Sequence, residues 1–230
     1  MGTAIVTGSS SGIGKACAQM LLEEGYRVIG ISRTRGDIEH PLFTHLACDL
    51  GDFTSVEALK TPLAHYDDLN LLVNAAGFGR FEPHEEITPS VIRDMVAVNL
   101  TAPMLLSRFT LRLLKRNRGT IVNITSIEAT RHAKFSALYT ATKTGLRSFG
   151  HTLFEELRPS GVAVLTINPD MTDTPFFDTL RFGVGDEDDM KLFASDIAGT
   201  LKNALSLRAG VSVTEITVRP RRFGISKKTR

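Results

Sequence analysis

Short runs rich in β-branched residues alternate with longer helical patterns along almost the whole chain, and this alternation constrains the fold more than any other feature. The runs are TAIVT, YRVIGIS, FTHLAC, NLLVNA, GTIVNIT, GVAVLTI and VTEITV, and a helical pattern follows the first of them from about Gly12 to Glu24. Strands that alternate with helices predict a parallel sheet covered by helices on both faces. Right-handed crossovers then predict an α/β fold with a doubly wound parallel sheet of about seven strands.

The chain of 230 residues suits one domain, residues 1–230, because single α/β units often exceed the usual domain length. Two helices are predicted to be long, one from about 89 to 117 and one from about 137 to 158, where proline and glycine end it. The segment 169–192 has no clear periodicity, which is typical of a functional loop. We therefore expect it to be a lid over the substrate.

The charge and cysteine patterns exclude several classes of partner. A net charge of +2 does not favour nucleic acid, and the basic residues 220–230 are predicted to form a solvated tail or a contact between subunits. Cys17 and Cys48 have no CxxC or Cys/His cluster near them, so we expect buried thiols in a reducing compartment and no metal site.

The sequence shows no signal-peptide pattern and no apolar run of about 18 residues, which favours a cytoplasmic protein without a membrane span.

The glycine-rich stretch TGSSSGIG directly follows the first predicted strand and begins the first helix, which is the position of a dinucleotide-binding loop. Gly8 permits a tight turn, and Gly12 and Gly14 allow a backbone or a pyrophosphate to approach closely. The helix N-terminus offers unpaired N–H groups and a positive dipole end to phosphate. An isolated loop of this kind is more often an ordinary strand-to-helix turn, but its place at the first crossover favours cofactor binding.

The second predicted strand ends at Ser32 and Arg33, where the ribose of a bound cofactor is expected. NAD-binding sites place an acidic residue there, and this strand end has none. Ser32 can donate its hydroxyl and Arg33 can bind phosphate through its guanidinium, with Arg35 as support. We therefore predict NADP(H) as the cofactor. The alternatives are a solvated basic loop and an NAD-type role for Asp37.

Tyr139 and Lys143 lie four residues apart, on one face of the second long helix, with Cβ atoms roughly 5–6 Å apart. A tyrosine with a pKa near 10 needs a shift of about 2 units to handle protons at neutral pH. One positive charge about 5 Å away supplies roughly 3 kcal/mol at an effective dielectric near 20, which is enough. The spacing predicts that Lys143 lowers the pKa of Tyr139. For an isolated pair, a half-buried tyrosine beside a solvated lysine is the commoner alternative.

Together these features resemble the short-chain dehydrogenase/reductase family over essentially the whole chain. The resemblance rests on TGSSSGIG, VNAAG ending at Gly77, VNL containing Asn99, ITS ending at Ser126, YTATK and NPDMTDT, in that order. It implies a Rossmann fold in which Ser126 binds the substrate oxygen and Tyr139 transfers the proton. It also implies that Lys143 lowers the pKa of Tyr139 and holds the nicotinamide ribose, while Asn99 supports a water that links Lys143 to solvent.

The resemblance further implies a cofactor site at the ends of the strands. Asp49 would lie beside the adenine and Asn74 would brace the sheet or the cofactor pocket, although either could be a cap at a strand end. Thr174 would contact the nicotinamide amide or a phosphate. The predicted cofactor-binding residues are Gly8, Ser10, Ser11, Gly12, Ile13, Gly14, Ser32, Arg33, Asp49, Leu50, Asn74, Ala75, Ala76, Gly77, Tyr139, Lys143, Pro169, Thr172 and Thr174.

The chain departs from the family pattern in three places. Ala75 stands where the family usually has a second asparagine, which bears on the backbone support of the cofactor. Asp170 stands where a glycine usually follows the proline, which bears on the geometry of the lid. The ending VRPRRFG replaces the glycine-rich ending of 3-oxoacyl-carrier-protein reductases, and this favours a general carbonyl or hydroxy-acid branch.

The predicted function is an NADP(H)-dependent oxidoreductase that acts on a small ketone, aldehyde or secondary alcohol. Candidate substrate residues are Phe78, Glu128, Met171 and Phe176, although phenylalanines are usually core residues and loop residues often face water. The alternatives are a 3-oxoacyl-carrier-protein reductase and a non-catalytic NADP-sensing protein, which would not need the four catalytic residues. The two long helices are expected to build a homodimer or homotetramer, as in the family.

Overall fold

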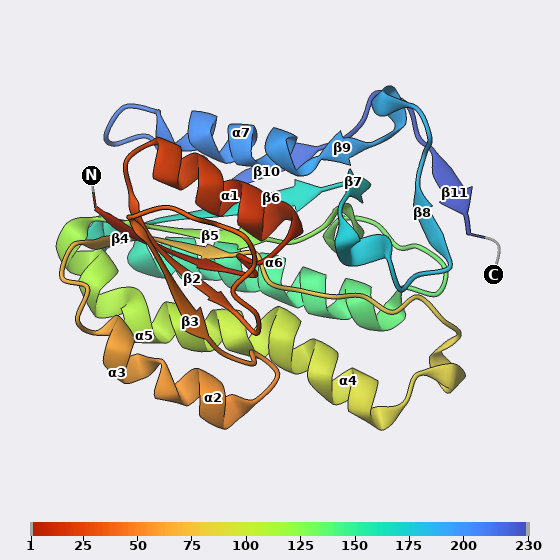
Figure 1. Ribbon diagram of the computed structural model, residues 1–230, viewed down its shortest axis with the longest axis horizontal. Coiled ribbons are helices and arrows are strands. Elements are labelled where there is room, and N and C mark those ends of the chain that lie inside the picture. The colour runs from red at the N-terminus through yellow and green to blue at the C-terminus, as the bar shows by residue number, and fades with distance from the viewer. Residues whose placement is uncertain (1, 229–230) are drawn as a thin grey trace.

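A computed structural model describes residues 2–228, and within them seven strands form one parallel sheet in the order β3-β2-β1-β4-β5-β6-β10 (Figure 1). The strands of this sheet are β1 (Thr3–Thr7), β2 (Arg27–Ser32), β3 (Phe43–Ala47), β4 (Leu69–Asn74), β5 (Thr120–Ile124), β6 (Ala163–Pro169) and β10 (Glu215–Val218). Every pairing in the sheet is parallel. The predicted doubly wound Rossmann fold is confirmed, with each of the seven sequence runs in its own strand.

Helices cover both faces of the sheet (Figure 1). Helices α1 and α7 lie on one face, and α2 to α6 lie on the other. The helices are α1 (Gly12–Glu23), α2 (Phe53–Ala58), α3 (Lys60–Leu63), α4 (Pro89–Val96), α5 (Ala102–Asn117), α6 (Ala137–Leu157) and α7 (Ala194–Leu205). No helix within residues 2–228 is both long enough and apolar enough to cross a membrane.

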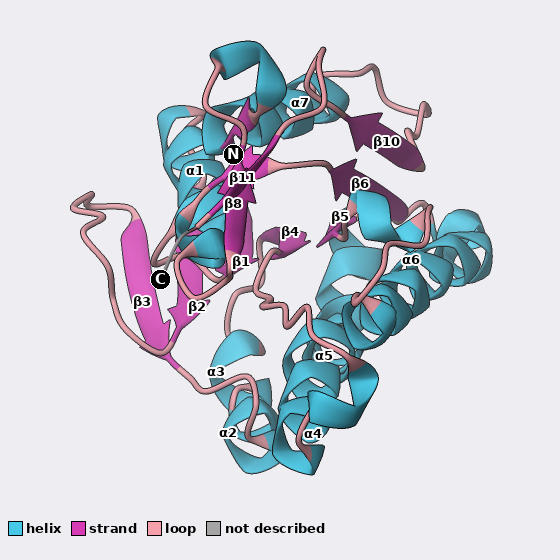
Figure 2. Cartoon of the chain, turned by 90° about the vertical axis from the view of Figure 1, so that its right-hand side faces the viewer, coloured by secondary structure: helices cyan, strands magenta, loops and turns pink. Residues whose placement is uncertain are grey.

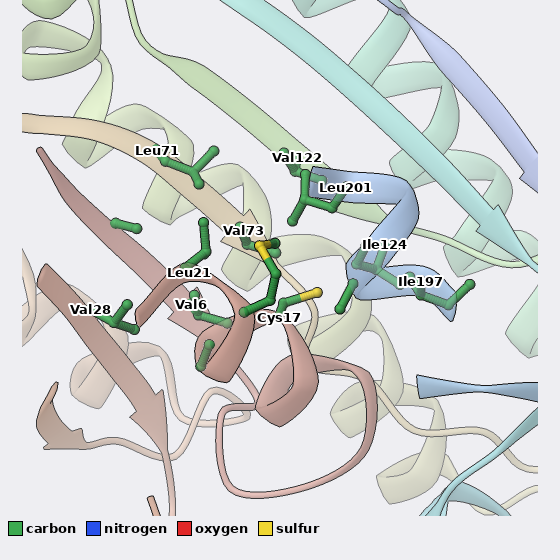
Figure 3. Close-up of a cluster of buried hydrophobic side chains, with 14 of the residues drawn as sticks. Val6, Cys17, Leu21, Val28, Leu71, Val73, Val122, Ile124, Ile197 and Leu201 are labelled. Atoms are coloured by element: carbon green, nitrogen blue, oxygen red, sulfur yellow. The ribbon is translucent and has the colours of Figure 1, made fainter. Parts of the chain in front are cut away.

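The central strands are apolar along their whole length because both of their faces are covered by helices. All five residues of β1 are buried. On one face, Cys17 and Leu21 of α1 meet Val6 of β1 and Leu201 of α7 in a dry cluster (Figure 3). Helices packed on both faces therefore make the sheet rigid, and the loops at its carboxyl edge begin from fixed positions.

The strand order reverses between β1 and β4, which lie side by side at the centre of the sheet. At such a reversal the loops from neighbouring strands run to opposite sides and leave a crevice at the carboxyl edge. The register pairs Val6 with Val73, and Asn74 with Asn123, so the loops after β1, β4 and β5 begin at the same level. The fold thus gathers the three motifs that follow these strands at one place.

Two small additional sheets lie beyond the carboxyl edge, in and around the segment 169–192. Strand β7 (Thr172–Asp173) pairs in parallel with β9 (Leu192–Phe193). Strand β8 (Phe182–Val184) pairs in antiparallel with β11 (Ile225–Lys227), which comes from the C-terminal segment (Figure 2). The predicted tail, residues 220–230, is described to 228, and its last two residues lie outside the described part of the chain. The sequence did not predict that this segment contacts its own chain.

Candidate active site

A cleft of about 1550 Å³ opens at the carboxyl edge of the sheet, over the reversal in strand order. This volume exceeds the roughly 300–1,000 Å³ of an ordinary small-molecule pocket, and it leaves room for a dinucleotide and a substrate. Most of the predicted site residues line it. These are Gly8, Ser10, Ser11, Gly12, Ile13, Gly14, Ser32, Arg33, Asp49, Leu50, Ala75, Ala76, Gly77, Phe78, Ser126, Glu128, Tyr139, Pro169, Met171, Thr172, Thr174 and Phe176.

The glycine loop has the close approaches that its sequence predicts. Gly8 has a positive φ of 68°, and a β-carbon at Gly14 would lie 2.3 Å from the carbonyl oxygen of Gly8. Only a residue without a side chain fits there, because that contact is with backbone. Gly12, at the first turn of α1, lies against Thr174, whose Cβ would be 3.3 Å from a β-carbon at Gly12. The loop and the start of the segment 169–192 thus form a narrow cradle at a helix N-terminus, which fits a pyrophosphate.

Thr7, at the end of β1, joins this loop to the loop after β4. Its hydroxyl oxygen accepts hydrogen bonds from the N–H groups of Ala75 and Ala76, each at 3.0 Å. Two adjacent backbone groups are therefore fixed by one buried side chain, and Ala75 needs no amide of its own for this support. Thr7 is the first residue of the TGSSSGIG motif, but the motif by itself predicts no role for its side chain.

Ser126 and Tyr139 lie together at the inner end of the cleft, and both are buried. Burial raises the pKa of Tyr139, a hydrogen bond with Ser126 lowers it, and the nearby Glu128 raises it. The net shift is upward because desolvation of the phenol is the largest cause, and Lys143 is not among the causes, so the lowering of this pKa by Lys143 stays a prediction. The sequence spacing placed the two residues correctly but carried no information about their burial.

Lys143 and Asn99 lie directly behind Gly77, and their side chains face the same point. A β-carbon at Gly77 would lie 3.1 Å from Lys143 Nζ and 3.2 Å from Asn99 Oδ1. Lys143 Nζ donates to the carbonyl oxygen of Ile124 at 3.0 Å, and burial lowers the pKa of Lys143 to about 8. Asn99 donates to the carbonyl oxygen of Phe78 at 2.9 Å and accepts from its N–H at 3.1 Å.

Asn99 has this position because the predicted long helix is not regular. Between α4 and α5 the stretch Ala97–Thr101 is π-helical, and the N–H of Ala102 donates to the carbonyl of Ala97, five residues back. Such bulges occur within α-helices and are frequent at functional sites. The bulge turns the fully buried Asn99 toward the carboxyl edge of the sheet. A buried asparagine is stable there because its amide forms hydrogen bonds with the backbone of Phe78.

Two predicted cofactor residues have side chains that are already engaged. Asn74 Nδ2 donates to Asn123 Oδ1 at 2.9 Å, so Asn74 braces β4 against β5 and does not line the cleft. The hydroxyl of Ser32 donates to the carbonyl of Thr34 at 2.7 Å, although Ser32 does line the cleft. Arg33 is exposed at the same end of the cleft.

Asp37, the alternative acidic residue, forms an ion pair outside the cleft. Its carboxylate pairs with Lys15 Nζ at 2.7 Å, and this ion pair keeps the pKa of Asp37 below its ordinary value. Asp37 is not among the residues that line the cleft. Of these two charged residues, Arg33 lines the cleft and Asp37 does not.

Aromatic rings lie around Tyr139 in the cleft. The ring centroid of Phe81 lies 5.1 Å from that of Tyr139, and the centroid of Phe176 lies 5.8 Å from it. Phe182 lies 5.2 Å from Phe81. Phenylalanines that are scattered in the sequence thus form one apolar wall, which suits the carbon skeleton of a substrate.

Two further residues of the cleft, one charged and one apolar, have no role in the prediction from sequence. Arg131 lines the cleft and donates to Glu128 Oε1 at 2.8 Å, so the buried Glu128 is paired rather than free. Ile225, from the C-terminal segment, also lines the cleft. No sequence signal marks either residue, because each reaches the site only through the fold. His132, between Ser126 and Tyr139, is exposed and does not line the cleft.

Comparison with known proteins agrees with this geometry. Residues 2–183 match the family model described as short chain dehydrogenase. An uncharacterized oxidoreductase of Staphylococcus epidermidis is 32% identical over 225 residues, which cover 94% of this chain and 96% of the relative. The chain belongs to the short-chain dehydrogenase family, and it is an oxidoreductase with a nucleotide-binding Rossmann fold.

Solved structures of the family have the same fold. The alcohol dehydrogenase of the archaeon Thermococcus sibiricus, complexed with 5-hydroxy-NADP, has a TM-score of 0.85 at 26% identity, over 97% of this chain and 99% of that one. A metagenomic short-chain oxidoreductase in complex with NADP has a TM-score of 0.78 at 29% identity, over 95% and 97% of the two chains. A 3-ketoacyl-(acyl-carrier-protein) reductase of Brucella melitensis, complexed with NADH, has a TM-score of 0.83 at 26% identity, over 94% and 96%.

Proposed function

We propose that this protein is an NADP(H)-dependent reductase of small ketones or aldehydes, which also oxidises the corresponding secondary alcohols. The observation that carries the proposal is the meeting of Ser126 and Tyr139 at the inner end of a cleft whose other end is the glycine loop. A proton donor and a phosphate cradle in one cleft are what hydride transfer to a carbonyl requires.

When bound, a nicotinamide supplies the hydride. Ser126 donates a hydrogen bond to the substrate oxygen and stabilises the negative charge that develops on it. Tyr139 gives its proton to that oxygen, and its raised pKa keeps the phenol protonated, in the donor form, at neutral pH. Lys143 holds the ribose and returns a proton to Tyr139, with Asn99 as its support. This chemistry favours reduction near neutral pH and oxidation only as the pH rises.

Several observations support NADP(H) over NAD(H). The end of β2 carries Ser32 and Arg33 without an acidic residue, and Asp37 is paired with Lys15. A 2′-phosphate carries close to two negative charges, and a charge-assisted bond to a guanidinium contributes roughly 1.5–3 kcal/mol. That energy corresponds to about a ten- to hundredfold preference. Of the three structural neighbours described above, two were solved with NADP-type cofactors and one with NADH, so the neighbours do not distinguish between the two cofactors.

The catalytic part of the proposal is tested with Tyr139→Phe and a panel of ketones and alcohols, followed by absorbance at about 340 nm. We expect turnover to fall by at least about a hundredfold, since general acid catalysis contributes that much, while the dissociation constant of NADPH stays unchanged. Tyr66→Phe, at a half-buried tyrosine outside the cleft, is the matched control. A Tyr139→Phe variant that keeps most of its kcat would disprove proton transfer by this residue.

The cofactor part is tested with Arg33→Ala, with Arg35→Ala as the control. Arg35 has the same charge, lies two residues away and does not line the cleft. We expect Arg33→Ala to raise KM for NADPH about tenfold or more and to leave KM for NADH unchanged. Equal weakening of both cofactors, or a wild type that uses NADH as well as NADPH, would show that this strand end does not read the 2′-phosphate.

A dimer or tetramer built from α5 and α6 remains part of the proposal. Both helices carry partly buried apolar residues beside their core positions, among them Leu105, Phe109 and Phe149. Such residues can serve the core and a second copy at once. Light scattering tests this over micromolar concentrations, where a monomeric mass would refute it.

A further inference from the structure

The C-terminal segment, residues 219–228, lies along the segment 169–192 of its own chain. Strand β11 is antiparallel to β8, and Ser226 faces Gly183. The N–H of Lys228 donates to the carbonyl of Arg181 at 3.0 Å, so by the alternation of an antiparallel ladder Ser226 and Gly183 also form a hydrogen-bonded pair. The hydroxyl of Ser226 adds a bond to the carbonyl of Val184 at 2.7 Å.

Side-chain contacts also join the C-terminal segment to the segment 169–192 at both ends of this short ladder. Arg222 forms ion pairs with Glu187 and with Asp189, the latter at 2.7 Å, and its N–H donates to the carbonyl of Asp189 at 2.9 Å. Lys228 Nζ donates to the carbonyl of Phe177 at 2.6 Å. Strands of three residues and exposed ion pairs are each weak when isolated. Their combination on one stretch is what holds the segments together.

A buried carboxylate connects the C-terminal segment to the base of the segment 169–192. Asp170, whose side chain is 1% exposed, accepts from Arg219 Nε at 3.0 Å and from the N–H of Met171 at 3.0 Å. Arg131 approaches the same carboxylate at 3.6 Å. Asp170 stands where the family pattern has glycine, so this connection is a property of the present chain.

The C-terminal segment also supplies part of the cleft itself. Ile225 lines the cleft together with Phe177 and Phe182, and the residue is 48% exposed. Next to it, a β-carbon at Gly224 would lie 2.8 Å from Cβ of Met190, so the backbone approaches the segment 169–192 as closely as a glycine permits. Ile225 therefore adds a half-exposed apolar side chain to the same cleft that Phe177 and Phe182 line.

We propose that residues 219–228 are a substrate-positioning element, which holds the segment 169–192 over the cleft and, through Ile225, contacts the apolar part of the substrate. This inference rests on the proposed function, because its effect on the substrate is read in turnover. It adds to that function a part of the chain that none of the family motifs contains. The C-terminal segment acts through the segment 169–192 and through Ile225, and it does not touch the reacting atoms.

Two variants and one control test the inference. Ser226→Pro removes the ladder N–H and the hydroxyl bond, and Arg222→Ala removes both ion pairs. Arg221→Ala removes an exposed arginine of the same segment that forms no hydrogen bond or ion pair with residues 2–228. Steady-state kinetics gives KM for the carbonyl substrate, KM for NADPH and kcat. Hydrogen exchange gives the protection of residues 182–184 without any substrate.

For Ser226→Pro combined with Arg222→Ala we expect KM for the carbonyl substrate to rise about tenfold, from the loss of one ladder bond and two ion pairs. KM for NADPH and the unfolding temperature should not change, and exchange at residues 182–184 should accelerate at least about tenfold. Arg221→Ala should behave as the wild type.

The possible outcomes separate this inference from the proposed function. Faster exchange with an unchanged carbonyl KM would overturn the inference, and so would an equal rise in KM for NADPH, because either result denies a specific effect on the substrate. If the wild type turns over no carbonyl or alcohol, the proposed function fails. The exchange measurement then decides by itself whether the C-terminal segment holds the segment 169–192: unaltered protection in the double variant overturns the inference, and lost protection supports it.

Discussion

Replacing Lys143 with methionine should stabilise the protein while it abolishes turnover. The side chain is buried, and burial lowers its pKa from 10.5 to about 8. Each pKa unit corresponds to about 1.4 kcal/mol, so the charged amine destabilises the folded state by roughly 3 kcal/mol. Methionine has a similar length and no charge. It also leaves the carbonyl of Ile124 without its hydrogen bond, which costs about 1 kcal/mol.

The net gain in the free energy of unfolding is therefore about 2 kcal/mol near pH 7, and it depends on pH in a defined direction. Below the folded pKa of about 8, both the folded and the unfolded wild type carry the proton, and the full penalty is present. Between about 8 and 10.5 the unfolded state binds more protons than the folded state, so the wild type gains stability as pH rises. Near pH 9.5 the remaining penalty is about 1 kcal/mol, and the two proteins should be equally stable.

Urea unfolding followed by circular dichroism measures this difference, since the chain has no tryptophan to report by fluorescence. Lys115→Met, at an exposed lysine of α5, should show no change with pH in its difference from the wild type. If Lys143→Met proved less stable than the wild type near pH 7, or if its advantage were constant up to about pH 10, burial of the amine would not be the dominant energy at this position.

Three other substitutions or modifications test the fold around the cleft. Gly14→Ala places a β-carbon 2.3 Å from the carbonyl oxygen of Gly8. We therefore expect fluorescence titration to show at least about tenfold weaker NADPH binding, with an unchanged circular dichroism spectrum. Unaltered affinity would mean that the glycine loop does not bind the pyrophosphate. Burial raises the pKa of Cys17 to about 12 and that of Cys48 to about 11. Near pH 8 both thiols should therefore resist a thiol reagent until urea is added, and rapid native labelling of either would contradict this. Leu21→Ala should lower the free energy of unfolding in urea by about 3 kcal/mol, because Leu21 is fully buried between α1, α7 and the sheet. A loss below about 1 kcal/mol would show that neighbouring side chains move to fill the cavity.

The sheet and most of the candidate site could be predicted from the sequence because their signals are local. Each strand is a continuous apolar run, and the parallel topology then brings the loops that follow the strands to one edge. Ser126 follows β5, and the segment from Ala75 to Gly77 follows β4, so their meeting needs only the strand order. The spacing of Tyr139 and Lys143 needs only the period of a helix.

Other parts could not be predicted because they depend on distant segments or on burial. Strands β11 and β8 have three residues each, which is too short and too mixed in composition to signal a strand pair, and Ile225 lies 41 positions after its ladder partner Val184. The bulge that turns Asn99 inward has no sequence signal. The raised pKa of Tyr139 comes from desolvation by aromatic rings contributed by Phe81 and Phe176, which no spacing in the sequence connects to it.

The π-helical stretch Ala97–Thr101 makes the position of Asn99 depend on the length of the backbone as well as on its side chain. A π-helical turn contains one residue more than an α-helical turn, so removal of a single codon there would let α4 and α5 join as one regular helix. The extra residue is accommodated within that one turn, so the helices before and after it would keep nearly the same orientation, and only the residues inside the turn, Asn99 among them, would change direction. The helix would survive and the amide would leave Phe78 and the neighbourhood of Lys143. A one-residue deletion in this stretch can thus inactivate the site while every catalytic residue type remains in the sequence.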